Sequence, residues 1–266
     1  MKVSRLVLFL ALSFAAPAFA AGNPPEKVIG ATVGDFADLV RESLIPALQK
    51  RGIPARLVEF TDYVQPNVAL AEGSLDLNIF QHKPYLEQFA KERHLALAPV
   101  AQVPTAPLGL YGGRLKSLQE VKEGSTVAVP NDPTNLARAL TIFADLGWIE
   151  LPKSIDAFKV TPGDIKENKK KLKIVQLEAA QLPRALADVD YAVINGNYVV
   201  SSGLSLTSAL AREKSDAYIN WAVVRSSDVG TPFAKAVDEV LHSEEFRKYA
   251  RAKFKGYKFP ADWKGQ

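Results

Sequence analysis

The chain has 266 residues, of which 47% are hydrophobic and 23% are charged. Its 33 Lys and Arg face 29 Asp and Glu, so the formal net charge is only +4, which excludes an electrostatic nucleic-acid binder and a polybasic membrane anchor as first hypotheses. The length is sufficient for two ordinary domains, and we expect a globular protein of that size.

The first twenty residues have the features of a secretory signal peptide. Lys2 and Arg5 form a charged start, residues 6–16 are an apolar run, and residues 18–20 (AFA) are a small-x-small cleavage pattern. Removing this segment lowers the net charge to +2, because it carries two basic side chains and no acidic one. The apolar run is shorter than the ~20 residues of a membrane span, so we expect cleavage near Ala20 and export of the remainder.

Sulfur is almost absent from the sequence. There is no Cys, and the single Met is Met1, which leaves with the signal peptide. A chain of this length would normally hold roughly nine sulfur residues. The lack of Cys excludes disulfides, thiolate metal sites and Cys nucleophiles, and it predicts that no lipid is attached through a Cys. Two explanations stay open: selection against oxidisable side chains, or sulfur economy in a protein made when sulfur is scarce.

The first half of the mature chain alternates short apolar strands with amphipathic helices. Strands are predicted at residues 28–33, 56–60 and 75–79, and residues 95–103 are expected to be extended. The helical spacing of apolar residues predicts helices at residues 36–48, 67–71 and 83–93. Gly52 and Gly73 mark the ends of the first two helices, and Pro46 predicts a bend in the first.

Residues 104–113 are rich in Pro and Gly, which predicts a crossover between two domains. The alternation then restarts, with strands predicted at residues 126–129, 172–177, 191–194 and 217–224. Helices are predicted at residues 133–146 and 183–189 and in the tail after residue 232. The charged run at residues 166–173 is typical of a solvated loop or helix face.

This alternation predicts an α/β protein with two lobes, each a mixed, mostly parallel sheet flanked by helices. We expect residues 27–113 and 218–266 to form lobe 1 and residues 114–217 to form lobe 2, joined by two crossover segments that act as a hinge. Ligands of open α/β sheets bind at the carboxyl ends of the strands. Two such edges that face each other would form a cleft that can close.

Enzyme motifs are not found in the sequence. There is no GxSxG nucleophile elbow and no phosphate-binding loop, and Gly112-Gly113 lacks the spacing of one. The three histidines, His82, His94 and His242, do not have the spacing of a helical metal pair. We therefore predict no catalytic residue, no metal and no cofactor.

The first candidate binding segment is formed by residues 61–67 (TDYVQPN) and residues 78–85 (NIFQHKPY). Tyr63, Phe80, His82 and Tyr85 lie near the end of a predicted strand, where a cleft would open. They are candidates for the walls of a ligand pocket. The alternative is that the aromatic rings belong to the core and that His82 is a hydrogen-bonded turn residue.

The second candidate segment, residues 129–138 (VPNDPTNLAR), runs from a strand into a helix. Asp132 before Pro133 is a strong helix start, with Asp as N-cap and Pro in the first turn. Asn135 and Arg138 are three residues apart and therefore share one helical face. Arg138 could hold a carboxylate with two hydrogen bonds while Asn135 adds a donor. The alternative is an interdomain or surface ion pair of Arg138.

The third candidate segment, residues 194–198 (INGNY), is a turn rich in amides after a buried strand. Its side chains could receive an ammonium and a carboxylate, although Asn-Gly is also a common turn dipeptide. The three segments together offer one strong cation, several amides, a His and aromatic walls. This set suits a zwitterion, and an amino acid is the simplest ligand that fits.

These same strings resemble the methionine-binding lipoprotein family, the substrate-binding subunits of methionine ABC importers. The resemblance covers nearly the whole mature chain in order and is most specific at residues 80–86 (FQHKPYL) and 130–138 (PNDPTNLAR). It implies a type II periplasmic-binding-protein fold, capture of methionine or a related amino acid by lobe closure, and delivery to a permease powered by an ATPase subunit. We expect a periplasmic monomer.

The resemblance also assigns roles to residues. It implies that Arg138 and Asn135 hold the ligand carboxylate and that Asn195 and Asn220 orient its polar end. It implies that Tyr63, Phe80, His82 and Tyr85 line the pocket for the side chain.

The sequence departs from the family pattern at several places. It lacks the lipobox Cys, so we expect a form that is not lipid-anchored, and residues 34–37 (GDFA) and 104–107 (PTAP) are unusual. Trp221 follows Asn220 where a small aliphatic residue is usual, which makes Trp221 a candidate for ligand specificity. Two alternatives stay open: a binder of a different small amino acid or dipeptide, and a periplasmic lyase that uses His82.

Overall fold

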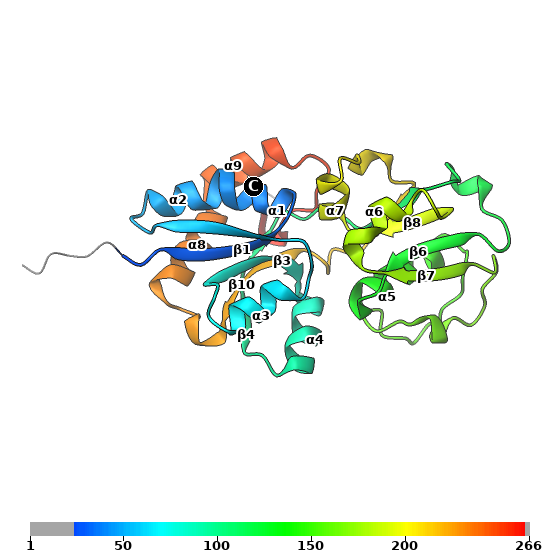
Figure 1. Ribbon diagram of the computed structural model, residues 1–266, viewed down its shortest axis with the longest axis horizontal. Coiled ribbons are helices and arrows are strands. Elements are labelled where there is room, and N and C mark those ends of the chain that lie inside the picture. Colours follow the sequence, from blue (N-terminus) through cyan, green and yellow to red (C-terminus); the bar gives the residue numbers. More distant parts are fainter. Residues whose placement is uncertain (1–23, 264–266) are drawn as a thin grey trace, which may run out of the picture.

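The computed structural model describes residues 24–263. The predicted signal peptide and its cleavage site lie outside the described residues. The chain forms two lobes, one containing most helices and one containing α5, α6 and α7 (Figure 1). Each lobe is built on a mixed sheet of five strands. The predicted two-lobed α/β architecture is therefore confirmed.

The strand order of the two sheets shows how the chain passes between the lobes. The sheet of the first lobe has the order β2 (Ala55–Phe60), β1 (Lys27–Thr32), β3 (Leu77–His82), β10 (Asn220–Arg225) and β4 (Leu97–Val103). The sheet of the second lobe has the order β7 (Lys173–Leu177), β6 (Thr126–Pro130), β8 (Tyr191–Ile194), β5 (Gly109–Gly112) and β9 (Ala211–Arg212). In each sheet the first three strands of this order pair parallel, whereas β10 and β5 pair antiparallel with both of their neighbours.

Helices cover both sheets. The first lobe carries α1 (Asp35–Leu39), α2 (Ile45–Gln49), α3 (Gln65–Ala71), α4 (Lys83–Arg93), α8 (Pro232–His242) and α9 (Glu244–Lys253). The second lobe carries α5 (Pro133–Asp145), α6 (Leu182–Ala185) and α7 (Gly196–Ser201). Short 3-10 turns lie at Leu118–Glu120, Pro162–Asp164, Ala179–Gln181, Leu206–Ser208, Ser226–Asp228 and Ala261–Trp263.

The bend predicted at Pro46 is a π-helical turn, Val40–Leu44, between α1 and α2. Proline has no N–H to donate to the carbonyl four residues earlier, and its ring crowds that carbonyl. The wider turn relieves the crowding without ending the helix. The apolar side chains of this stretch therefore stay on one face against the sheet.

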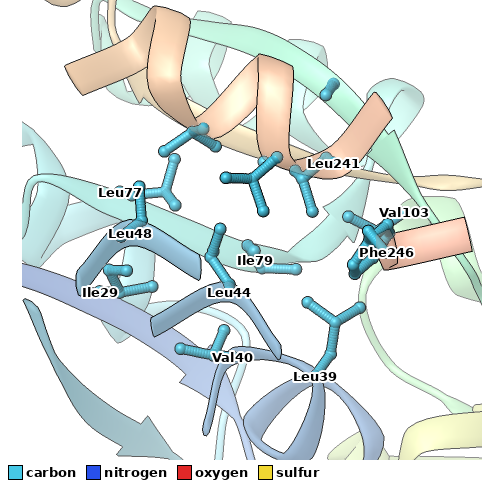
Figure 2. Packing of buried hydrophobic residues seen from close by; sticks show 14 of the residues in the cluster. Ile29, Leu39, Val40, Leu44, Leu48, Leu77, Ile79, Val103, Leu241 and Phe246 are labelled. Atoms are coloured by element: carbon cyan, nitrogen blue, oxygen red, sulfur yellow. The ribbon is translucent and has the colours of Figure 1, made fainter. Parts of the chain in front are cut away.

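The core of the first lobe lies between its sheet and the helices of both chain ends. Figure 2 shows Leu44 and Leu48 from the first helical stretch facing Ile79 of β3 and Leu241 of α8. These four side chains are fully buried or nearly so, and burial of each contributes about 1.5–3 kcal/mol of transfer free energy. The second lobe has its own core around Phe143, Trp148 and Tyr191.

The expected boundary between the lobes is wrong at one strand. Residues 109–112 were predicted to be crossover in the first lobe, but they form β5, which pairs with β8 of the second sheet from Gly109↔Ile194 to Gly112↔Tyr191. The local sequence does not predict this strand, because Gly109 and Gly112 are typical of loops. A Cβ on Gly109 would lie 3.0 Å from the Tyr111 ring, and a Cβ on Gly112 would meet the Leu115 carbonyl at 2.6 Å.

Other elements differ from the prediction in extent. The helix expected at residues 183–189 is the short α6, and the turn expected at residues 194–198 continues into the helix α7. The strand expected at residues 217–224 begins at Asn220, because residues 213–219 form one of the two connections between the lobes. The other connection is residues 104–108.

Candidate functional site

A cavity lies between the two lobes, and all eight residues proposed from the sequence as ligand-binding line it. Its wall consists of Phe36, Tyr63, Phe80, Gln81, His82, Tyr85, Thr105, Ala106, Asn135, Arg138, Asn195, Gly196, Asn197 and Asn220. The space between its lining atoms is about 380 Å³, including the part that is open to solvent, and it leaves room for about one water molecule. It is therefore narrow, and an amino acid enters only if the lobes or side chains move apart.

One wall of the cavity is aromatic. The Tyr63 ring stacks on Phe80 with 5.9 Å between centroids and meets Tyr85 edge-on at 6.1 Å. The Tyr85 hydroxyl donates to the Tyr63 carbonyl at 2.7 Å, which fixes the two rings relative to each other. These rings offer an apolar surface to a ligand side chain while their polar atoms are already satisfied.

His82 lies where β3 ends and α4 begins. Its Nδ1 accepts a hydrogen bond from the Tyr85 backbone N–H at 3.2 Å, so the proton of the neutral ring is on Nε2, which donates to Asn135 Oδ1 at 3.2 Å. Burial and the nearby Arg138 hold the pKa of His82 well below its usual range. With both nitrogens engaged and the ring neutral, His82 is a structural link between the lobes and is poorly placed for acid–base chemistry.

The start of α5 has the predicted cap. Asp132 Oδ1 accepts from the Asn135 N–H at 3.0 Å, and Asp132 Oδ2 accepts from Asn135 Nδ2 at 2.9 Å. Burial raises the pKa of Asp132, and the hydrogen bonds from Asn135 partly offset this. Asn135 Oδ1 accepts from both His82 and Arg138, so the side chain of Asn135 joins three other residues.

Arg138 is buried and has an ion-pair partner that the sequence did not indicate. Its Nε and Nη2 donate to the two carboxylate oxygens of Glu213 at 2.8 and 2.5 Å, and its Nη1 donates to Asn135 Oδ1 at 2.6 Å. The guanidinium also lies over the Tyr218 ring at 4.4 Å. The Nε and Nη2 edge, which can give a carboxylate two parallel hydrogen bonds, is thus occupied by Glu213, so Arg138 does form an ion pair, the alternative that the sequence left open. Of the five guanidinium N–H groups, two are left for another acceptor among the described residues.

The amide segment at the start of α7 provides unpaired polar atoms. Asn195 Oδ1 and Asn197 Nδ2 are buried and have no hydrogen-bond partner among the described residues. Asn197 Oδ1 accepts from the Tyr63 hydroxyl at 2.6 Å, which orients the amide. A buried polar atom without a partner is costly unless a ligand or water supplies one. The cavity wall therefore contains one unpaired acceptor and one unpaired donor, two residues apart in the sequence.

Asn220 is held in place by a β-bulge. The pairing of β10 with β3 shifts between Trp221 and Ala222, so Phe80 has no direct partner in β10. The Phe80 carbonyl accepts from Asn220 Nδ2 at 2.8 Å, and the Asn220 N–H donates to Thr105 Oγ1 at 2.8 Å. Asn220 thus joins the aromatic wall to the connection at residues 104–108.

The specificity role expected for Trp221 is not supported by its position. Successive residues of a strand point to opposite faces. Asn220 lines the cavity, whereas Trp221 packs against the apolar cluster formed by Leu70, Leu75, Leu86 and Val223. Trp221 is therefore partly buried against the core of the first lobe and does not line the cavity.

Six wall residues were not among the sequence candidates: Phe36, Gln81, Thr105, Ala106, Gly196 and Asn197. Asn197 belongs to the amide-rich segment, so its residue type was a usable signal. Phe36 fits the apolar face of α1 equally well, and Gln81 lies within a buried amide cluster with Asn67 and Asn78. Only the folded chain distinguishes these residues from core positions.

Two negative findings concern the part of the chain that the structure describes. Within residues 24–263, no group of three or more His, Cys, Asp or Glu side chains is arranged to hold a metal ion. Over the same residues, none of the helices has the length and apolar character needed to cross a membrane.

Comparison with known proteins identifies the family. The sequence model of the NlpA lipoprotein family matches residues 28–262, nearly all of the described chain. The chain belongs to this family. The match includes both lobes and every residue of the cavity wall.

Individual members of the family are similar over most of their length. The D-methionine-binding lipoprotein MetQ of Salmonella typhi is 39% identical over 238 residues, 88% of each chain. Outer membrane lipoprotein 3 of Mannheimia haemolytica is 38% identical over 96% of this chain and 98% of its own. A nutrient-binding protein from Burkholderia cenocepacia, solved with bound methionine, has a TM-score of 0.82 and 38% identity, and the match covers 88% of this chain and all of that one.

The structure shows where the unusual segments of this NlpA-family chain lie relative to the cavity. Phe36 in the segment 34–37 and both Thr105 and Ala106 in the segment 104–107 line the cavity. Besides the missing lipobox Cys there are three departures, and two of them are at the candidate site, where they can affect which ligand side chain fits. The third, Trp221, is not.

Proposed function

We propose that this protein is the substrate-binding component of an ABC importer and that it captures methionine or a closely related amino acid between its lobes. The observation that carries the proposal is the pairing of two different surfaces in one cavity. The buried polar groups of Arg138, Asn195 and Asn197 lie on the second lobe, and the aromatic wall of Tyr63 and Phe80 lies on the first.

The polar surface suits the backbone part of an amino acid. Asn195 Oδ1 can accept from an ammonium group, while Asn197 Nδ2 and the two remaining N–H groups of Arg138 can donate to a carboxylate. The aromatic surface suits an uncharged, flexible side chain, and thioethers make favourable contacts with aromatic rings. A ligand that contacts both lobes at once would hold them together.

The family relatives support the rest of the proposal. Several are named D-methionine-binding lipoproteins, and a structure similar to this one, from Coxiella burnetii, is described as the periplasmic substrate-binding protein of an ABC transporter. We infer a permease and its ATPase subunit as partners, with the protein acting in the periplasm as a monomer without a lipid anchor. No catalytic step is part of the proposal.

The first test is to identify the ligand. Mass spectrometry of the small molecules released by denaturing the purified protein should detect intact methionine. Calorimetric titration of stripped protein should give tight binding of L- or D-methionine and at least tenfold weaker binding of glutamate and lysine. Retention of another amino acid would keep the transport role but change the ligand, and turnover of the bound molecule would favour a lyase.

A pair of variants tests the site itself. Asn195→Ala removes a buried acceptor and should weaken methionine binding at least tenfold, which corresponds to about 1.4 kcal/mol. The matched control is Asn131→Ala, because Asn131 is an exposed amide that donates to Glu178 at 2.7 Å and does not line the cavity. Equal affinities of the two variants would show that the ligand binds elsewhere.

A further inference from the structure

Glu213 is a buried carboxylate next to the cavity wall but not part of it. It lies in the connection at residues 213–219, and its side chain is 6% exposed. It accepts three hydrogen bonds: two from Arg138 and one from the Leu108 N–H at 2.9 Å, in the other connection between the lobes. The Glu213 N–H in turn donates to the Leu108 carbonyl at 3.1 Å. Both connections therefore hold Glu213 in position against Arg138.

The net charge around the cavity depends on Glu213. Among the described residues of the cavity wall, Arg138 is the only Lys, Arg, Asp or Glu, and the one His there, His82, is neutral because it is buried beside Arg138 and its Nδ1 accepts from the Tyr85 N–H. Asp132 lies behind Asn135 and does not line the cavity. The positive charge of Arg138 and the negative charge of Glu213 directly behind it cancel, so the cavity and its immediate surroundings carry no net charge. Without Glu213, the cavity would carry one buried positive charge.

A neutral wall discriminates between ligands of the same shape. A zwitterion brings a carboxylate for the free N–H groups of Arg138 and an ammonium that compensates it. An anion of the same shape brings the carboxylate alone and would leave one buried negative charge without compensation, which is expensive in a desolvated site. A cavity with an unpaired Arg138 would favour the anion instead.

We propose that Glu213 is a specificity-determining residue that neutralises Arg138, so that the cavity selects net-neutral zwitterions over anions of the same shape. The inference rests on the proposed function, because it takes methionine as the zwitterion. Glu213 acts through Arg138 and does not itself contact the ligand.

The test compares methionine with 4-(methylthio)butanoate, which has the same carboxylate and side chain but lacks the ammonium group. Calorimetric titration of the wild-type protein should give at least tenfold tighter binding of methionine. In Glu213→Gln, which keeps the size of the side chain but removes its charge, the ratio of the two affinities should fall at least tenfold. A purely structural role of Glu213 would weaken both ligands in proportion and leave the ratio unchanged, which would overturn the proposal.

The matched control is Asp145→Asn. Asp145 pairs with Lys214, the residue after Glu213, at 3.2 Å. The substitution therefore removes one negative charge close to Glu213 but leaves the partners of Arg138 unchanged. The ratio of the affinities of Asp145→Asn for methionine and for the anion should equal that of the wild type. If Glu213→Gln does not fold, the double variant Arg138→Gln/Glu213→Gln restores a neutral wall and should keep the wild-type ratio within threefold. A shift toward the anion in the double variant would contradict the proposal.

The titrations of the wild-type protein separate the proposed function, methionine binding, from the proposed role of Glu213 in specificity. If the wild-type protein binds methionine but its ratio does not depend on Glu213, only the present inference fails. If it binds methionine and the anion equally, the inference also fails, while transport remains. If it binds neither, the proposed function fails and the inference fails with it.

Discussion

Asp35 is a carboxyl group buried at the start of α1, with 3% of its surface exposed. One oxygen accepts from the Phe36 N–H at 2.9 Å, while Oδ2 has no partner among the described residues. The pKa of Asp35 is raised from 3.8 to about 7: burial and the nearby Asp38 raise it, and the Phe36 N–H and the Tyr257 hydroxyl offset part of this rise. The folded protein therefore binds a proton here that the unfolded chain releases at neutral pH.

This bound proton predicts a pH dependence of stability. Because the pKa is raised on folding, the stabilising effect is full below pH 3.8 and is lost as the pH rises toward 7. Asp35→Asn keeps the acceptor for Phe36 but cannot ionise. The free energy of unfolding of the variant relative to the wild type should therefore rise between pH 5 and pH 8 by about 3 kcal/mol.

The measurement is urea unfolding of both proteins at several pH values. The difference between the two proteins isolates Asp35 from the other groups that titrate in this range. A difference that is constant from pH 5 to pH 8 would show that Asp35 is ionised in the folded protein.

At the scale of the elements, α7 positions the amide groups of the cavity. It lies beside α1 at the junction of the lobes (Figure 1). Gly196, its first residue, packs so closely on the connection between the lobes that a Cβ there would lie 2.7 Å from the backbone carbon and oxygen of Ala106. The absence of a side chain at residue 196 is therefore what lets Asn195 and Asn197 face the cavity.

Gly196→Ala should move α7 away from the connection. The forced contact should lower the free energy of unfolding by about 1–3 kcal/mol and weaken methionine binding at least tenfold, because the flanking amides shift. The control is Gly163→Ala, where a Cβ would meet only Thr161 Oγ1 at 3.5 Å. Thermal melting and calorimetric titration measure the two effects. Wild-type affinity in Gly196→Ala would show that the amides do not depend on this packing.

At the scale of the whole molecule, the lobes contact each other directly through the cavity wall. Within the part of the chain that the structure describes, these side-chain hydrogen bonds cross between them: Tyr63 to Asn197 at 2.6 Å, His82 to Asn135 at 3.2 Å, and Tyr198 to the Thr61 carbonyl at 2.9 Å. Each such bond contributes about 0.5–1.5 kcal/mol. The balance between open and closed forms should therefore respond to the loss of one of them.

Tyr198→Phe removes one bond between the lobes and should shift the ligand-free protein toward the open form. Small-angle X-ray scattering should show a larger radius of gyration than for the wild type. Tyr191→Phe is the matched control, because its hydroxyl donates to the Ser117 carbonyl at 2.7 Å within the second lobe. The same radius in both variants would show that this bond does not hold the lobes together.

Much of the fold and of the site follows from local patterns in the sequence. The alternation of strands and helices indicates the α/β lobes, because periodicity and capping involve residues within a few positions of one another. Asp132 and Pro133 start α5 as expected, and that start places Asn135 and Arg138 on one face. The strand ends at His82 and Ile194 likewise bring their neighbours to the cleft.

The features that the sequence did not indicate depend on distant pairings. Residues 109–112 form a strand only because β8, more than 70 residues later, pairs with them. The face of Trp221 depends on which neighbours β10 finds in the sheet. The ion pair of Arg138 joins residues 75 positions apart. No pattern within one segment contains these partners.

The sequence by itself thus determined the architecture and eight of the fourteen residues that line the cavity, because short-range hydrogen bonding and apolar periodicity decide where strands end and helices begin. Only the tertiary structure decided which hydrogen-bonding groups of those side chains are left for a ligand. The edge of Arg138 that Glu213 occupies, the tautomer of His82 and the unpaired amides of Asn195 and Asn197 depend on contacts between segments far apart in the chain. Burial and charge pairing are properties of the folded whole, and in this protein they set the chemistry of the site.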